Sequence, residues 1–253
     1  MIKLSVNLNK VATIRNSRGG SVPSVLDAVD VCVDAGAPGI TVHPRADERH
    51  ITRADVRAIA ARIQERAPQV EYNIEGDPRP DLIELVEAVR PTQCTLVPVV
   101  PGEITSQAGW RAGLPRDRLP AVIERLHASG VRVSVFVDAA PDPIEWAASV
   151  GAERIELYTE PFARAFEREG AELDQVFAQF STAARLAHQL GLGVNAGHDL
   201  DLDNLRVFRT LPYLDEVSIG HAIISRAVFV GLATVVREYL DVLAAARSRA
   251  DRV

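Results

Sequence analysis

One local pattern recurs four times along the chain and restricts the fold more than any other feature. A segment with helical spacing of apolar residues ends in a glycine, and a run rich in β-branched residues follows at once. Glycine is favoured just past a helix, because it adopts the left-handed conformation that ends the helix without strain. The four glycines are Gly36, Gly130, Gly151 and Gly191. Repeated helix–glycine–strand units predict alternating helices and strands that build a parallel sheet.

Eight strands are expected, which is the number that closes a (β/α)8 barrel, the TIM barrel. The predicted strands are residues 2–8, 38–43, 69–74, 93–97, 131–137, 153–158, 192–195 and 215–219. The length of 253 residues suits one barrel, so residues 1–253 are predicted to form a single α/β domain. Residues 161–170 are extra to the repeat and are predicted to form a short added helix or lid after the sixth strand.

Two helix starts carry local signals. Thr52, with Asp55 three residues later, resembles a capping box, in which each side chain bonds the backbone N–H of the other residue. Asp142 before Pro143 predicts another helix start, with Asp142 as the cap and Pro143 at the first helical position.

Composition excludes several classes of function. The formal net charge of −6 offers no basic surface for nucleic acid. The two cysteines, Cys32 and Cys94, are isolated and show no metal-ligand spacing, which fits a reducing cytosol and no metal site. No signal-peptide pattern precedes the first strand, and the most apolar tract, residues 222–236, is too short to span a bilayer. A cytoplasmic protein without membrane contact is therefore predicted.

Polar residues collect where the predicted strands end, and a TIM barrel carries its active site at the carboxyl ends of its strands. The last two strands are followed by Gly-His pairs, Gly197-His198 and Gly220-His221. Glycines let phosphate oxygens approach backbone N–H groups, and the loops after the last two strands are the usual phosphate site. We expect a phosphate to bind there.

The segment after the second strand combines imidazole and guanidinium groups. They are His43, Arg45, Arg49 and His50. Arginine suits bidentate phosphate binding, and histidine suits proton transfer near neutral pH. His43 ends an apolar strand, which favours a functional role over a solvated charged loop.

The loop after the first strand contains Arg18-Gly19-Gly20. Such a loop can bind an anion through backbone N–H groups and one guanidinium. The alternative is a flexible basic turn.

Three carboxylates are candidates for acid–base chemistry. By alternation along the third strand, Glu71 and Glu75 share one face, and Glu71 is expected in the carboxyl-terminal opening of the barrel as a general base. Glu75 precedes a Gly-Asp-Pro turn and is interpreted as an exposed turn residue. Glu156, between two apolar neighbours, is expected to point into the barrel, with either a structural or a supporting role.

Seven segments between Val6 and Arg226 form a combination that is specific as a whole, although no single one suffices. They are Val6-Asn7 with Ala12-Thr13 and Arg15-Asn16, Arg18-Gly19, residues 39–43, 49–52, 96–98, 194–198 and 219–224. Together, over nearly the whole chain, they resemble the pyridoxine 5′-phosphate synthase family.

The resemblance implies a TIM barrel that needs no metal or organic cofactor and is usually a homo-octamer. It implies two small phosphorylated substrates, 1-deoxy-D-xylulose 5-phosphate and 3-amino-2-oxopropyl phosphate, which condense to pyridoxine 5′-phosphate, phosphate and water. His43 and Glu71 would then be general bases and His198 a general acid. The deoxyxylulose phosphate would contact Arg45, His50 and Thr105, and the amino-ketone phosphate would contact Asn7, Arg18, Gly220 and His221.

The chain departs from the family pattern around the substrates. Asn9-Lys10 stands where the family has Asp-His, Asp199 follows His198 where glycine is usual, and Glu160-Pro161-Phe162 replaces Gly-Cys-Tyr. Asn9 and Lys10 remain expected substrate contacts. Asp199 is expected beside a phosphate site, either turned away or paired, for example with Lys10.

Two other functions stay open. A desolvated Lys10 could form a Schiff base, as in an aldolase or isomerase that acts on a sugar phosphate. The chain could also be a non-catalytic sensor of a phosphate ligand, although the set His43, Glu71 and His198 favours catalysis.

Overall fold

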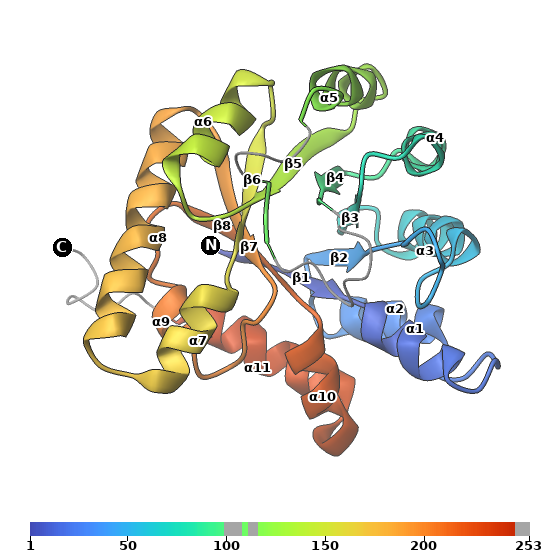
Figure 1. The fold of residues 1–253 in the computed structure, drawn as a ribbon. Coiled ribbons are helices and arrows are strands. Elements are labelled where there is room, and N and C mark those ends of the chain that lie inside the picture. The colour runs from blue at the N-terminus through green and yellow to red at the C-terminus, as the bar shows by residue number, and fades with distance from the viewer. Residues whose placement is uncertain (99–107, 111–115, 246–253) are drawn as a thin grey trace.

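Eight parallel strands close into a barrel in sequence order, and β8 pairs with β1. The structure, a computed structural model, describes residues 1–98, 108–110 and 116–245 (Figure 1). The strands are β1 (Lys3–Asn7), β2 (Gly39–Val42), β3 (Glu71–Gly76), β4 (Gln93–Leu96), β5 (Arg132–Val137), β6 (Arg154–Tyr158), β7 (Gly193–Gly197) and β8 (Leu214–Ile219). The predicted TIM barrel is confirmed.

Helices surround the barrel on its outer side (Figure 1). They are α1 (Asn9–Asn16), α2 (Val25–Asp34), α3 (Arg53–Arg66), α4 (Pro80–Val89), α5 (Leu119–Ala128), α6 (Pro141–Ser149), α7 (Glu160–Arg168), α8 (Ala171–Gln189), α9 (Leu205–Phe208), α10 (His221–Val230) and α11 (Leu232–Ala244). The added helix predicted after the sixth strand is α7, which packs against α8.

The helix ends follow the local signals with one exception. Thr52 and Asp55 form the predicted capping box at the start of α3. The four glycines of the repeated unit all have positive φ, between +76° and +96°, as a left-handed helix end requires. The cap expected at Asp142 is wrong, because α6 begins at Pro141 after Ala140. The earlier proline takes the first helical position, where its missing N–H costs nothing.

The apolar core lies between the barrel and the helices, whereas the interior of the barrel is polar. Outward-facing residues such as Leu4, Val133 and Val135 are fully buried. Inward-facing positions at mid-height carry Ser5, Thr41, Asn73, Thr95, Ser134, Glu156, Asn195 and Ser218, all buried. Branched apolar residues usually fill this space. Hydrogen bonds between neighbouring strands, such as the 2.6 Å contact of the Ser5 and Thr41 hydroxyls, offset the cost of burying polar groups here.

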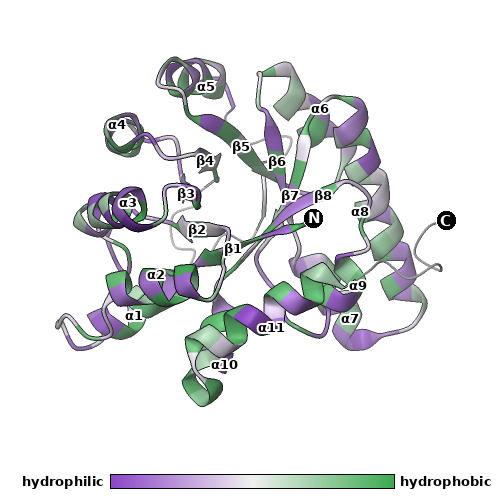
Figure 2. Cartoon of the chain, turned by 180° about the vertical axis from the view of Figure 1, so that it is seen from behind, coloured by the Kyte–Doolittle hydropathy of each residue, from purple (hydrophilic) through white to green (hydrophobic). Residues whose placement is uncertain are grey.

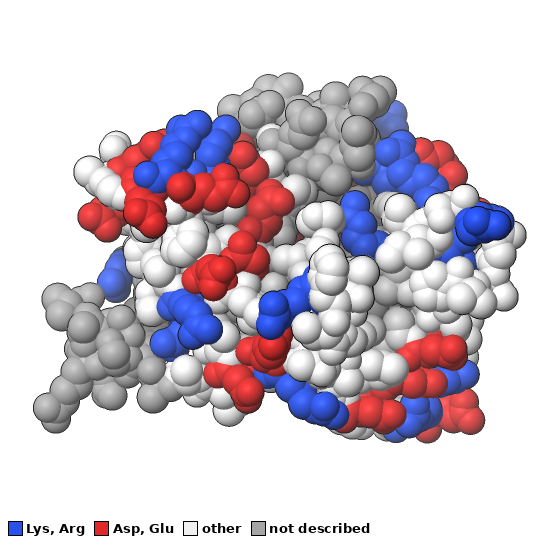
Figure 3. Space-filling model, turned by 90° about the horizontal axis from the view of Figure 1, so that it is seen from below, with Lys and Arg blue, Asp and Glu red and all other residues white. Residues whose placement is uncertain are grey.

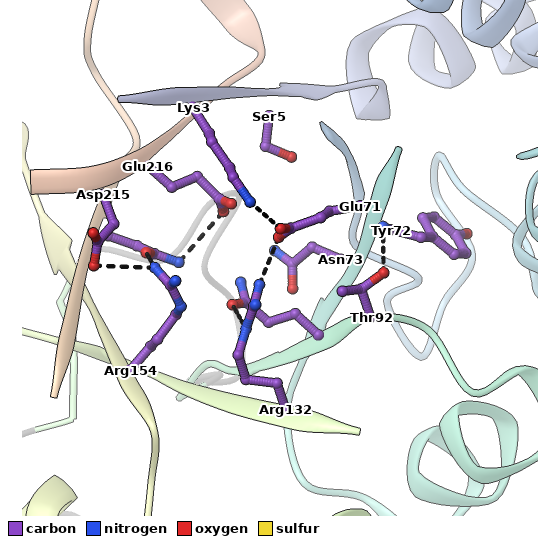
Figure 4. A network of polar contacts seen from close by, with 12 residues as sticks. Lys3, Ser5, Glu71, Tyr72, Asn73, Thr92, Arg132, Arg154, Asp215 and Glu216 are labelled. Atoms are coloured by element: carbon purple, nitrogen blue, oxygen red, sulfur yellow. Dashed lines mark hydrogen bonds and ion pairs between the residues drawn. The ribbon is translucent and has the colours of Figure 1, made fainter. Parts of the chain in front are cut away.

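A charged network lies at the amino-terminal end of the barrel (Figure 4). Lys3 of β1 and Arg132 of β5 both donate hydrogen bonds to Glu71, the latter at 2.6 Å. Arg154 of β6 contacts Asp215 of β8 at 3.3 Å. Each of these ion pairs joins two strands that are separated by one other strand in the barrel.

The position expected for Glu71 is wrong. Strand β3 begins and ends two residues later than predicted, so Glu71 is its first residue and lies at the amino-terminal end. Partial burial raises the pKa of Glu71, but its hydrogen bonds with Lys3 and Arg132 outweigh this and hold the pKa below the ordinary value. Glu71 is therefore an ionised member of the charged network, about 13 Å in Cα position from Glu75 at 3.3 Å per strand residue.

Candidate active site

A cavity of about 580 Å³ opens at the carboxyl-terminal end of the barrel. Every strand, or the segment that follows it, contributes to its lining. The lining residues are Asn7, Asn9, Lys10, Thr13, His43, Arg45, Arg49, His50, Glu75, Val97, Phe136, Glu156, His198, Asp199, Ser218, Gly220 and His221. Eleven of the predicted site residues are among them, so side chains far apart in the sequence meet here as expected.

Three predicted site residues do not line this cavity. Glu71 lies at the opposite end of the barrel. Arg18 is exposed in the turn after α1. Thr105 lies outside the described residues.

Asn9 connects the ends of β1 and β2. Its side-chain oxygen accepts a hydrogen bond from the backbone N–H of His43 at 2.8 Å, and its backbone N–H donates to Oδ1 of Asn7 at 3.0 Å. Asn9 therefore positions His43 through the backbone, in addition to any contact with a substrate.

The two imidazoles after β2 are neutral at pH 7. Burial, with the charges of His50 and Arg45, lowers the pKa of His43 to about 3. Burial, with Arg45 and Lys10, lowers the pKa of His50 to about 4. The backbone N–H of Ile51 donates to Nδ1 of His50 at 2.9 Å, which leaves the proton of the neutral ring on Nε2. In the described part of the chain, the buried Nε2 of His43 has no hydrogen-bond partner.

Glu75 is the main residue that sequence reasoning missed. It is 8% exposed rather than an exposed turn residue, because the two-residue shift of β3 places it at the carboxyl-terminal end of the strand. Burial raises the pKa of Glu75 to about 8. Its carboxylate accepts hydrogen bonds from Ser218 Oγ and Asn7 Nδ2, each at 3.4 Å. The clue in the sequence was the alternation itself, since Glu75 follows Glu71 and Asn73 on the inward face.

Glu156 points into the barrel as predicted and is 3% exposed. Burial, with the nearby Glu75 and Glu216, raises its pKa well above the ordinary value. Among the described residues, Oε2 of Glu156 finds no hydrogen-bond partner. A Cβ on Gly197 would lie 2.2 Å from Oε1 of Glu156, so the glycine of the Gly197-His198 pair makes room for this carboxyl group.

His198 and Asp199 form a pair. Nδ1 of His198 lies 2.6 Å from Oδ2 of Asp199, and this hydrogen bond lowers the pKa of the carboxyl group. The candidate partner Lys10 is not needed to explain Asp199. Because the carboxylate accepts the Nδ1 proton, Nε2 is the atom that His198 can present to a ligand. The ring also packs edge-on against Tyr158, with centroids 5.1 Å apart.

The Gly220-His221 pair forms the amino-terminal end of α10 at the cavity. A Cβ on Gly220 would lie 3.0 Å from the backbone oxygen of Asn7, so only glycine fits without displacement. Unpaired N–H groups and the helix dipole make a helix start favourable for a phosphate. Arg45, His50 and Lys10 also line the cavity, and the charges of Arg45 and Lys10 act on His50; the three supply cationic and N–H donors for a second anion.

Two searches of the described residues concern other kinds of site. Across residues 1–98, 108–110 and 116–245, no three His, Cys, Asp or Glu side chains converge as a metal site would need. In the same residues, no helix has the length and apolar character to cross a membrane.

Comparisons with known proteins identify the family of the chain. Residues 4–245 match the family described as pyridoxal phosphate biosynthesis protein PdxJ. The chain belongs to the PdxJ family. A PdxJ relative from Porphyromonas gingivalis, named pyridoxine 5′-phosphate synthase, is 51% identical over 96% of this chain and 100% of its own length. One of the same name from Leptospira biflexa is 47% identical over 96% of this chain and 97% of its own length.

Solved structures show the same fold at low sequence identity. Tryptophan synthase from M. tuberculosis superposes with a TM-score of 0.65 at 13% identity, covering 97% of this chain and 93% of that one. Phosphoribosyl anthranilate isomerase from Thermus thermophilus gives 0.59 at 15% identity, covering 97% and 100%. These similarities support the barrel of this PdxJ chain and not its chemistry.

Proposed function

We propose that this chain is a pyridoxine 5′-phosphate synthase, which condenses 1-deoxy-D-xylulose 5-phosphate with 3-amino-2-oxopropyl phosphate. The observation that carries the proposal is the single cavity that joins neutral imidazoles, protonated carboxyl groups and two anion-binding regions. Imine formation, dehydration and ring closure need several proton transfers, and two phosphate esters need two anion sites. Neither a metal nor an organic cofactor is part of the proposal.

The cavity groups take complementary roles in this reaction. His43, a neutral imidazole whose Nε2 has no hydrogen-bond partner among the described residues, accepts protons as a general base. His198 acts as a general acid in its imidazolium form, which gives up the Nε2 proton while Asp199 accepts a hydrogen bond from Nδ1. The deoxyxylulose phosphate binds near Arg45, His50 and Lys10. The amino-ketone phosphate binds at Asn7, Gly220 and His221, with contacts from Arg18 and Thr105 still predictions.

The test is a reaction of the purified protein with both substrates in metal-free buffer. Pyridoxine 5′-phosphate, identified by mass spectrometry, and inorganic phosphate should appear in equal amounts. His43→Ala should abolish turnover while the protein still binds inorganic phosphate, which also separates an enzyme from a phosphate sensor. Absence of product from a high concentration of folded wild-type protein would reject the proposal.

A Schiff-base reaction at Lys10 is the second candidate, since this half-buried amine lines the cavity. Borohydride reduction in the presence of a keto-phosphate should then attach the substrate to Lys10. Failure to label Lys10 under conditions of turnover removes this candidate.

We also propose that the chain forms a homo-oligomer, with an octamer implied by the resemblance alone. The last turn of α10 exposes Val228, Phe229 and Val230, and Phe229 is 87% accessible to solvent. Figure 2 shows this helix as hydrophobic, and Figure 3, viewed from the side where α10 lies in Figure 1, shows uncharged atoms between charged clusters. Apolar side chains in such a group favour burial against another copy. Sedimentation of wild type and Phe229→Glu tests this. A cytoplasmic location also remains a prediction.

A further inference from the structure

Glu75 has no role in the chemistry derived so far, although it occupies the floor of the active-site cavity. Its carboxyl group lies 3.9 Å from Nδ1 of His43 and within 3.4 Å of Asn7 and Ser218. We propose that Glu75 is a further catalytic residue, the acid that protonates the substrate carbonyl oxygen while neutral His43 accepts the amine proton. This inference rests on the proposed function and adds a proton donor to it.

The surroundings of Glu75 keep its proton in place before the reaction. The titratable groups around it are His43 from the β2 end, Glu156 from β6, Glu216 from β8 and Cys94 from β4. Burial, with the charge of Glu216, sets the pKa of Glu75 at about 8, so the carboxyl group is mostly protonated at pH 7. His43 is neutral at the same pH. The cavity therefore holds one acid and one base side by side.

Geometry gives the two groups separate tasks. The 3.9 Å separation of Glu75 Oε2 and His43 Nδ1 is longer than a hydrogen bond, so neither group neutralises the other before substrate arrives. It is short enough for a carboxylate and an imidazolium to stabilise each other once a proton has moved. The raised pKa of Glu156 keeps that carboxyl group neutral, so Glu156 adds no negative charge to that of Glu216 against ionisation of Glu75.

The proton transfers balance over imine formation. The substrate amine attacks the ketone carbon, so a C–N bond forms and the carbonyl π bond breaks. Glu75 gives its proton to the carbonyl oxygen, and the amine nitrogen gives one to His43. The imidazolium of His43 then protonates the departing hydroxyl group, which leaves as water. The resulting iminium returns its N–H proton to the Glu75 carboxylate, which restores both residues.

The test compares Glu75→Gln with the wild type by steady-state kinetics between pH 5 and pH 10. Glutamine keeps the shape, since its carbonyl oxygen can accept from Asn7 and its NH2 group can donate to the Ser218 hydroxyl, but it cannot supply a proton. We expect kcat to fall about 10²–10⁴-fold, the usual contribution of one general acid, with KM for both phosphates little changed. Wild-type kcat should also decline above about pH 8 as Glu75 ionises, and this alkaline decline should be absent from the variant.

Glu216→Gln is the matched control, because Glu216 is a buried barrel carboxyl with a raised pKa that does not line the cavity. It should keep wild-type kcat near pH 6, and its alkaline decline should move to lower pH, because loss of the Glu216 charge lowers the pKa of Glu75. Equal losses in the two variants, unchanged kcat in Glu75→Gln, or an alkaline decline that persists there would overturn the inference.

If Glu75→Gln does not fold, Glu75→Asp replaces it. Its retracted carboxyl should lower kcat and keep the alkaline decline, and unchanged kcat would again overturn the inference. No product from the wild type rejects the proposed function as well, whereas an active wild type with an unaffected variant rejects only the role of Glu75.

Discussion

Substitution of Gly197 by alanine tests how tightly the active-site floor is packed. The new Cβ would lie 2.2 Å from Oε1 of Glu156 and 3.2 Å from the backbone oxygen of Ser218, whereas ordinary contacts lie at 3.4–4 Å. Glu156 is buried and has no solvent to move into. The Gly197 carbonyl accepts hydrogen bonds from the backbone N–H and the hydroxyl of Thr159, which restrains the backbone as well.

Overpacking of this kind costs about 1–3 kcal/mol. For a domain of this size each kcal/mol shifts the melting temperature by roughly 2–4 °C, so Gly197→Ala should melt roughly 2–12 °C below the wild type. Differential scanning calorimetry at equal protein concentration measures the shift. Gly20→Ala is the control, because a Cβ there meets nothing within 4 Å and it should melt as the wild type does.

A second substitution shows whether the cost arises at the carboxyl group. Glu156→Ala removes the clashing atoms, so the double variant should be more stable than the sum of the single effects predicts. If Gly197→Ala melts with the wild type, or if the two effects simply add, the steric reasoning is refuted.

Three other substitutions address the carboxyl groups. Glu71→Gln should cost about 1–2 kcal/mol by weakening the charged network but leave kcat unchanged, and a fall in kcat with unaltered stability would restore the catalytic role that the resemblance implies. Asp199→Asn should lower kcat about tenfold or more, because the Asp199 carboxylate no longer holds the ring proton of His198 on Nδ1. Kinetics that match the wild type at every pH would contradict this. In the folded protein Glu75 keeps its proton up to about pH 8, whereas in the unfolded chain it loses the proton near pH 4.5. The free energy of unfolding of the wild type should therefore fall, relative to that of Glu75→Gln, as pH rises from 4.5 to 8, by at most about 5 kcal/mol. Urea unfolding of both proteins at pH 5, 7 and 9 checks this. A difference in unfolding free energy that stays the same at all three pH values would disprove it.

Local sequence patterns were sufficient to predict the barrel fold. The helix-ending glycines and the capping box at Thr52 depend on neighbours within one turn, so the sequence predicted them correctly. Strand β3 shows the limit of such patterns. Alternation placed Glu71 and Glu75 on the same face, but which of them reaches the carboxyl-terminal end depends on pairing with β2 and β4. A shift of the strand by two residues keeps each side chain on the same face of the sheet but moves it along the barrel axis. That movement places Glu75 at the carboxyl-terminal end and Glu71 at the amino-terminal end.

The sequence by itself determined the order of strands and helices and most of the groups that meet at the site. It contained the histidines, the carboxylates and the Gly-His pairs in recognisable positions. Only the tertiary structure decided that Asp199 pairs with His198 and that Glu75 rather than Glu71 lies in the cavity. It alone decided which groups carry protons, because desolvation of Glu75 and His43 depends on side chains that distant strands bring around them.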